Sequence, residues 1–286
     1  MPKDPKHHYI PVFYLQQWAD ARSRLIEFSR QGPDRVVKPR PTSPTGTGYV
    51  RGLYRVDDID PGVVNAVEAL FMKPSDGLAA EALQCLLAER AFPKPGPMRT
   101  SWSRFMLSLM IRYPEAVALM KKQLRENVEK MYDQTRTPDQ PATFAEYEAK
   151  QNTHDMARVH GKLLMDLMQD SRMGKLIFGM HWGVMKLKNY RHDLLTSDRA
   201  IASNIFPISA HHMCLPISPR MVFVACATQQ AKEEFTRLDP HAVMQAMNNT
   251  IVRQAQTYVW GTDDSQLRYV KNRLGRESGP IGAYLI

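Results

Sequence analysis

Cysteine is scarce in this chain, with only three among 286 residues, and long apolar runs are missing. An odd number of widely spaced cysteines fits neither a disulfide framework nor a cysteine-based zinc site, so we expect free thiols in a reducing cytoplasm. No apolar run approaches the roughly 18 residues that cross a bilayer. The charged start of the chain is not followed by an apolar stretch either, so we expect neither a membrane span nor a signal peptide.

The chain also lacks clustered basic sequence, although its overall charge is positive. The formal net charge is +9, which favours anionic partners such as nucleic acid, nucleotides or phosphorylated metabolites. The lysines and arginines are scattered, and no zinc-finger, RNP or P-loop pattern occurs. Charge therefore indicates nucleic acid or another anionic ligand as a partner without identifying it, and it says nothing about the oligomeric state.

What the chain does contain is an ordinary globular composition with secondary-structure signals that change along its length. We predict strands in residues 1–60, helices in 61–172, strands in 173–228 and helices in 229–286. Because strands and helices come in groups rather than in regular alternation, the order favours an α+β fold. We expect one domain over residues 1–286, with a mostly antiparallel mixed sheet, built from the N-terminal and C-terminal segments, packed on a central group of helices.

Three finer expectations concern the boundaries of individual elements. Residues 175–187 (KLIFGMHWGVMKL) are typical of a strand, and residues 143–169 of one long helix capped by Thr143. The helical pattern over 63–91 contains a Pro/Gly break at 73–77, which we expect to divide it into two helices.

The densest group of chemically active side chains lies near the amino terminus, at His7-His8-Tyr9. On an extended strand, neighbouring side chains point to opposite sides, so one of the two histidines can face a pocket. His8 is the candidate acid, base or ligand there, and Tyr9 a candidate for substrate contact. The structural alternative is that His8 and Tyr9 cap and pack this segment while His7 is exposed.

A second polar group, Thr196-Ser197-Asp198, follows an apolar pair and is expected at a strand end. Short polar side chains there satisfy backbone N–H groups or face a cleft. Asp198 could hold a metal, orient His8 or act as a general base, or it could form a plain surface pair with Arg199. Ser197 is a further candidate for substrate binding.

Five other side chains are weaker candidates. Arg112 stands at the end of a helix, where the macrodipole alone favours a cation, but it could also clamp a phosphate or carboxylate. Arg220, in a Ser-Pro-Arg turn, is a second candidate clamp, and Asn248 is a polar residue inside a helix, where asparagine is mildly unfavourable. Glu68 and Asp76, eight residues apart in a helical stretch, are weak candidates to bind a divalent metal.

Several motifs resemble one known family. The segment HHYIPVFYLQQWAD resembles the opening of the domain-of-unknown-function family 4238, whose members begin with His-Tyr-x-Pro-x-x-Tyr-Leu. RFMLSLMIRYPEAV, LLTSDRAI and LPISPRMVFVA are similar to later motifs of the family, so the resemblance covers most of the chain. Ala200 stands where the family usually has proline, which loosens that turn. The resemblance implies a soluble bacterial or phage-associated protein without a settled activity.

Three interpretations remain open at this stage. In the first, the chain is a hydrolase, such as a metal-dependent nuclease, that uses His8 as acid or base and Asp198 as a ligand or orienting carboxylate against an anionic phosphodiester. In the second, the same residues form a non-catalytic module that binds nucleic acid or another partner. In the third, His8, Tyr9 and Asp198 form a buried hydrogen-bonded lock. All three require the N-terminal segment to meet Asp198.

Overall fold

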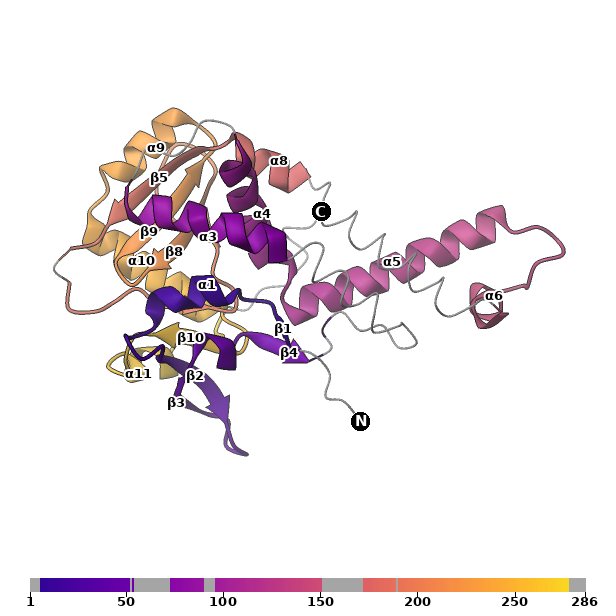
Figure 1. Ribbon diagram of the computed structural model, residues 1–286, viewed down its shortest axis with the longest axis horizontal. Coiled ribbons are helices and arrows are strands. Elements are labelled where there is room, and N and C mark those ends of the chain that lie inside the picture. The colour runs from indigo at the N-terminus through magenta and orange to yellow at the C-terminus, as the bar shows by residue number, and fades with distance from the viewer. Residues whose placement is uncertain are drawn as a thin grey trace.

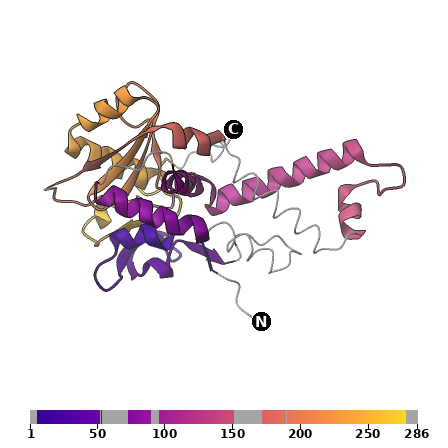
Figure 2. The same ribbon diagram turned by 45° about the horizontal axis from the view of Figure 1, so that its top comes forward.

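The computed structural model describes residues 6–51, 53, 73–89, 96–150, 172–188 and 190–277. Figure 1 shows a body of sheets and helices from which helix α5 (Pro114–Thr135) projects, with the short helix α6 (Phe144–Lys150) near its far end. Figure 2 shows the same projection from a second direction. The α+β class is confirmed, and the described strands form three antiparallel sheets rather than one mixed sheet.

The first sheet is a two-stranded ribbon of β1 (Lys6–His8) and β4 (Tyr49–Arg51), which places His8 opposite Tyr49. The chain then turns into α1 (Val12–Leu15) and the 3-10 helix η1 (Gln16–Trp18). The first strand is therefore shorter than the sequence suggested. Helical turns suit this segment because its large side chains at positions 14, 15 and 18 recur at helical spacing and are buried together in the core.

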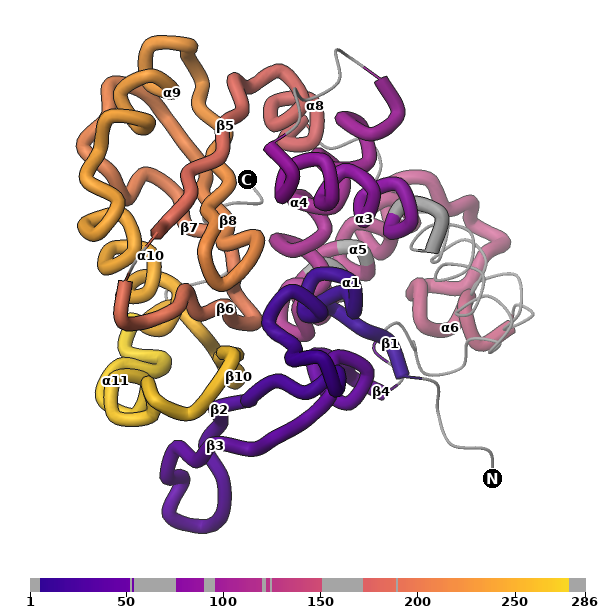
Figure 3. Tube along the Cα trace, turned by 60° about the vertical axis from the view of Figure 1, so that its left-hand side comes forward, coloured from indigo at the N-terminus to yellow at the C-terminus, as the bar shows by residue number. Residues whose placement is uncertain are grey.

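The second sheet joins segments from opposite ends of the chain. Its strand order is β3-β2-β10-β6, in which β2 (Leu25–Gln31) and β3 (Val36–Thr42) form an N-terminal hairpin. The C-terminal strand β10 (Tyr258–Gly261) pairs with β2 on one side and with β6 (Thr196–Ser197) on the other. Figure 3 shows these strands gathered at the lower end of the body. The expectation that N-terminal and C-terminal segments share a sheet is met here.

The third sheet has the order β5-β9-β8-β7 and lies between two layers of helix. Its strands are β5 (His181–Lys186), β9 (Met221–Cys226), β8 (His212–Ser218) and β7 (Ala202–Ser203). Along β9 the side chains alternate between two hydrophobic clusters, because successive side chains of a strand point to opposite faces. A strand buried on both faces must be apolar throughout, as MVFVAC is.

The helices that cover this sheet divide between its two faces. One face packs against α3 (Lys73–Leu87) and α4 (Pro97–Ile111) in the cluster that contains Trp102 and Phe105. The other face packs against α9 (Gln229–Thr236) and α10 (Pro240–Gln254), through Phe235 and Met247. The last described helix, α11 (Leu267–Lys271), packs on the second sheet beside β3. The short 3-10 helix η2 (Pro44–Gly46) precedes β4.

One boundary prediction was wrong, and two can be followed only in part. Residues 172–179 form helix α8 (Arg172–Gly179), and the strand begins only at His181. Helix α3 begins at Lys73, so Pro74 lies in its first turn, where the N–H that proline lacks would be unpaired anyway. The part of the 63–91 pattern that precedes it lies outside the described residues, so the division into two helices stays a prediction. The expected helix over 143–169 is described as far as Lys150, in α6, and the remainder lies outside the described residues. In the described part of the chain, no helix is long and apolar enough to cross a membrane.

Candidate functional site

Asp198 follows β6 directly and ties it to the start of β10. Its carboxylate accepts hydrogen bonds from the backbone N–H groups of Gln256 (2.9 Å), Thr257 (2.6 Å) and Tyr258 (3.0 Å). Its own N–H donates to the Tyr258 carbonyl at 3.1 Å. The residue is 4% exposed, and burial raises the pKa of its carboxyl group to about 6, although the three backbone donors oppose that rise. The predicted surface pair with Arg199 is therefore not the main role of this carboxylate.

A small cavity lies beside Asp198, and Tyr9 is another of the residues that line it. Its volume is about 20 Å³, which is room for about one water molecule. Burial, assisted by the Asp198 carboxylate, raises the pKa of the Tyr9 phenol. The amino-terminal segment therefore does reach the Thr-Ser-Asp turn, and it does so through Tyr9. The cavity is lined by Tyr9, Tyr113, Pro114, Glu115, Asp198, Arg199, Gln256 and Thr257.

The two histidines lie on opposite sides of β1, as the strand geometry predicts. His8 is half-buried, its ring centre lies 5.5 Å from that of Tyr49, and it is not among the residues that line the cavity. The structural alternative had His7 exposed, but it is buried, because its side of the ribbon faces the interior. Cooperation between His8 and Asp198 stays a prediction.

Two other side chains, Tyr14 and Trp18, bond the amino-terminal segment to the later sheets. Neither was among the candidate residues predicted from the sequence. The Tyr14 hydroxyl donates to the Pro216 carbonyl (2.7 Å) and contacts the Thr196 hydroxyl at 2.8 Å. The Trp18 indole N–H donates to the Leu194 carbonyl at 2.7 Å. Helix α1 and η1 are thereby bonded to two sheets at once.

Arg112 and Asp76 meet each other rather than a ligand. The guanidinium of Arg112, buried at the end of α4, lies 3.5 Å from the Asp76 carboxylate on α3. One predicted anion clamp and one predicted metal ligand thus form a helix-to-helix ion pair. The second candidate ligand, Glu68, lies outside the described residues. Within the described ranges, no three His, Cys, Asp or Glu side chains are grouped as a metal site would require.

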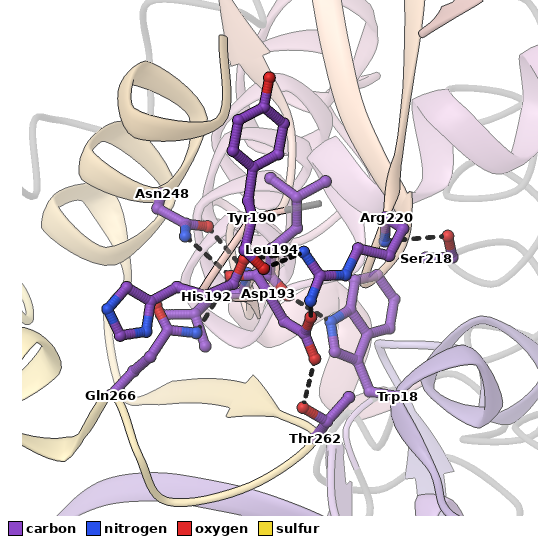
Figure 4. A network of polar contacts seen from close by, with 11 residues as sticks. Trp18, Tyr190, His192, Asp193, Leu194, Ser218, Arg220, Asn248, Thr262 and Gln266 are labelled. Carbon is purple, nitrogen blue, oxygen red and sulfur yellow. Dashed lines mark hydrogen bonds and ion pairs between the residues drawn. The ribbon is translucent and has the colours of Figure 1, made fainter. Parts of the chain in front are cut away.

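Arg220 and Asn248 both fix the loop that leads into β6 (Figure 4). Arg220 pairs with Asp193 at 2.6 Å and donates to the carbonyls of Tyr190 (2.9 Å) and His192 (3.2 Å). The Asn248 side-chain NH₂ donates to the Asp193 carbonyl at 2.9 Å. The Asn248 side-chain oxygen accepts a hydrogen bond from the Leu195 backbone N–H at 2.8 Å. Their polar chemistry was recognised from the sequence, but the structure directs it inward.

Asp193 is the centre of this network, and no local sequence pattern marks it. Besides its contacts with Arg220 and Asn248, it accepts a hydrogen bond from the Thr262 hydroxyl at 2.7 Å and, at its carbonyl, from Gln266 at 3.0 Å. Ser197, a predicted substrate contact, is buried, and its hydroxyl accepts the backbone N–H two residues later at 3.2 Å. The loop and its neighbours are therefore internally bonded.

A different region presents polar groups to solvent, on the β1–β4 ribbon and the adjoining face of the second sheet. On the ribbon, the Lys6 ammonium lies 4.3 Å from the centre of the Tyr49 ring. Hydrogen bonding to Glu27 and the nearby phenols of Tyr258 and Tyr49 raise the pKa of Arg40, which places these groups in one neighbourhood. We call this region the aromatic–basic surface; its residues are Lys6, His8, Lys38, Arg40, Tyr49 and Tyr258.

The registers of the second sheet show how this surface is built. Lys38, Ser29 and Tyr258 stand side by side in one row across three strands. The next row on the same face, two residues along, contains Arg40 and Glu27, because side chains two apart on a strand point the same way. The opposite face is covered by the hydrophobic cluster of α10 and α11. In the sequence, this face is marked by the two cations of VVKPRPT, Lys38 and Arg40, which are two residues apart and so point to the same side of β3.

The one acid in these rows is buried, while its partner cation reaches solvent. Glu27 is 2% exposed and accepts hydrogen bonds from Arg40 at 3.1 and 2.9 Å. Thr47 donates to the same carboxylate at 2.5 Å, and Trp260 donates to the Thr47 hydroxyl at 2.9 Å. The Arg40 side chain is 49% exposed, and neither of its contacts with Glu27 uses Nη1. The face therefore presents positive charge outward.

Together, the fold and this surface define an α+β protein whose described strands form three antiparallel sheets, with exposed cations on β1 and β3 beside half-buried tyrosines. The chain belongs to the family described as protein of unknown function (DUF4238), whose model matches residues 6–265. The resemblance inferred from the opening, Thr-Ser-Asp and Ser-Pro motifs is thereby confirmed. Neither a curated protein nor a solved structure matches the chain.

Proposed function

We propose that this protein is a non-catalytic module that binds an anionic partner on the aromatic–basic surface. The observation that carries the proposal is that Lys6, Lys38 and Arg40 are exposed there, whereas Glu27, the acid of the same rows, is buried. Cations beside low-dielectric aromatic surface attract anions and steer them to the site. The net charge of +9 acts in the same direction.

The other two candidate arginines, Arg112 and Arg220, already have partners within the protein, which also favours this surface as the binding site. Arg112 is buried and paired with Asp76. Arg220 is 43% exposed, but both of its terminal nitrogens already have partners, Asp193 and the carbonyls of Tyr190 and His192. Arg40 is paired as well, but Glu27 holds it by one edge and half of the side chain remains open to solvent. It is therefore the guanidinium best placed to contact an incoming anion.

Removing two lysines from this surface should weaken binding to a model polyanion. We expect Lys6→Ala/Lys38→Ala to lose about five- to tenfold in affinity for immobilised heparin at about 50 mM salt, because two cations no longer release counterions from the ligand. Biolayer interferometry provides the measurement. The matched control is Lys150→Ala/Lys271→Ala, which removes two exposed lysines from α6 and α11 and should stay within about twofold. Equal losses in the two double variants would contradict the proposal.

A hydrolase that acts on phosphodiesters is the second candidate, and one observation favours it. Asp198 has a carboxyl pKa of about 6 and lines a cavity together with Tyr9. A carboxyl group that titrates near neutral pH can exchange protons in acid–base catalysis. The present cavity holds about one water molecule, so a phosphodiester would enter only after the side chains around it had moved.

A nuclease assay separates this candidate from the binding module. With Mg²⁺ or Mn²⁺ added, a hydrolase of this design should degrade DNA or RNA and should lose at least about 100-fold in rate in both His8→Ala and Asp198→Asn, since acid–base groups contribute about 10²–10⁴. The rates are measured on gels with circular dichroism as a folding control. Degradation that survives both substitutions, or no degradation by the wild type, excludes the hydrolase candidate and leaves the binding proposal intact.

A further inference from the structure

We infer that the ligand of the aromatic–basic surface is a single-stranded nucleic acid, with bases stacked on Tyr49 and Tyr258 and phosphates held by Lys6, Lys38 and Arg40. This inference rests on the proposed function and specifies its partner. It combines two features that single-strand binding needs in the same place, a set of cations that follows the backbone and aromatic rings on which unpaired bases stack.

The cations are spaced across the surface rather than gathered at one point. Lys38 and Arg40 lie two residues apart on β3, about 7 Å along the strand. Lys38 and Tyr258 stand in the same row two strands apart, which is about 10 Å. Lys6 adds a cation on the ribbon, beside Tyr49. An extended chain with repeated negative charges can contact such an array, whereas a compact anion reaches one cation at a time.

The two tyrosines are held as platforms. The Tyr258 ring stacks on Trp260, with ring centres 5.7 Å apart and planes at 23°, so one side of the phenol is supported by a buried indole. The Lys6 ammonium lies over the Tyr49 ring and His8 packs against that ring at a tilt of 60°, so a base that stacks on Tyr49 takes the place of Lys6, which is then free to contact a phosphate. Both tyrosines remain half-buried rather than fully buried, so part of each side chain is open to a ligand.

Arg40 is the fixed cation of the array. Two hydrogen bonds to Glu27 hold its guanidinium plane, so it loses less side-chain freedom on binding than a lysine would. Duplex DNA presents its phosphates but hides the faces of its bases within the stack, so the tyrosine platforms would contribute nothing to its affinity. The presence of the rings therefore favours an unpaired strand as the ligand.

Fluorescence anisotropy with a labelled oligothymidine of about 12 nucleotides, and with a duplex of equal length, tests the inference in EDTA so that no metal-dependent cleavage intervenes. We expect the single strand to bind at least about tenfold more tightly than the duplex. Tyr258→Ala should weaken single-strand binding about tenfold, since a stacked base contributes about 1–3 kcal/mol, while Tyr258→Phe keeps the ring and should remain within about twofold. Lys38→Ala should reduce the salt slope by about 0.7.

Tyr147→Ala on α6, which removes a half-buried tyrosine outside the surface, is the matched aromatic control. Arg40 is left unchanged, because removing it would leave Glu27 buried without its cation. Equal affinity for single strand and duplex, lowered by Lys38→Ala but not by Tyr258→Ala, would overturn the single-strand inference and leave the proposed function standing. Binding to neither oligonucleotide would overturn the single-strand inference, and the proposed function would then stand or fall on the heparin measurement. Oligonucleotide and heparin binding that both ignore Lys38→Ala would overturn both.

Discussion

Between about pH 4 and pH 6, the free energy of unfolding of the wild-type protein should fall by about 2 kcal/mol relative to that of Asp198→Asn, out of about 3 kcal/mol over the whole titration. Asp198 titrates near pH 6 in the folded protein, and an aspartate in an unfolded chain titrates near 3.9. In this window the folded protein retains a proton that the unfolded chain has released. The stabilisation from the protonated carboxyl group is therefore complete below about pH 4 and is lost as the pH rises to about 6.

Urea denaturation at pH 4, 5, 6 and 7 measures this difference. Asparagine keeps the shape of the side chain and one oxygen acceptor but cannot ionise, so its curve lacks this contribution. Asp264→Asn, at an exposed aspartate before α11, is the matched control and should follow the wild type. If the three backbone donors outweighed burial, Asp198 would titrate below 3.9 and the difference between the curves would change sign. That result, or parallel curves, would contradict the assignment.

Asn248→Ala should destabilise the protein by about 3 kcal/mol and lower its melting temperature by about 5–10 °C. The substitution removes the amide that bridges the Asp193 carbonyl and the Leu195 N–H. Both backbone groups lie at a buried junction of loop and helix. The Leu195 N–H would lose its acceptor, while the Asp193 carbonyl would keep only Gln266. A buried donor without an acceptor costs about 1–3 kcal/mol.

Asn249→Ala is the control for this prediction, because it makes the same chemical change one position along α10 at a half-buried site. Thermal melting followed by circular dichroism should show a shift of about 1 °C or less for Asn249→Ala. Equal shifts in the two variants would mean that helix propensity, and not the bridge to the loop, accounts for the effect.

Side chains with a local signal were predicted well from the sequence, and side chains with a distant partner were not. The all-apolar segment MVFVAC is a strand because both of its faces are buried, and that composition is visible in the sequence. Arg112 looked like an anion clamp because its ion-pair partner, Asp76, lies 36 residues away on another helix. Arg220 and Asn248 were recognised as polar positions, but their common partner, Asp193, had no local pattern that would single it out.

The two-part polar site was predicted from the motifs in outline only. Tyr9 and Asp198 do line one cavity, while His8 points along the other side of the ribbon toward Tyr49. A shift of one residue along a strand turns a side chain to the opposite face, and which face is covered depends on what packs there. No property of the segment HHYIP alone decides that. The aromatic–basic surface was missed for the same reason, since β4, β3 and β10 are far apart in the chain.

The sequence by itself determined the α+β class, the family and the net positive charge, because composition, short motifs and periodicity are properties of neighbouring residues. Only the tertiary structure decided which cations remain open to solvent. That choice depends on which groups surround each guanidinium. Arg112 is buried against Asp76, and Arg220 already contacts Asp193 and two backbone carbonyls. Arg40 contacts Glu27 through Nε and Nη2, and its side chain is 49% exposed. Contacts between groups distant in the chain form only when the sheets assemble, and they set the charge that a ligand meets.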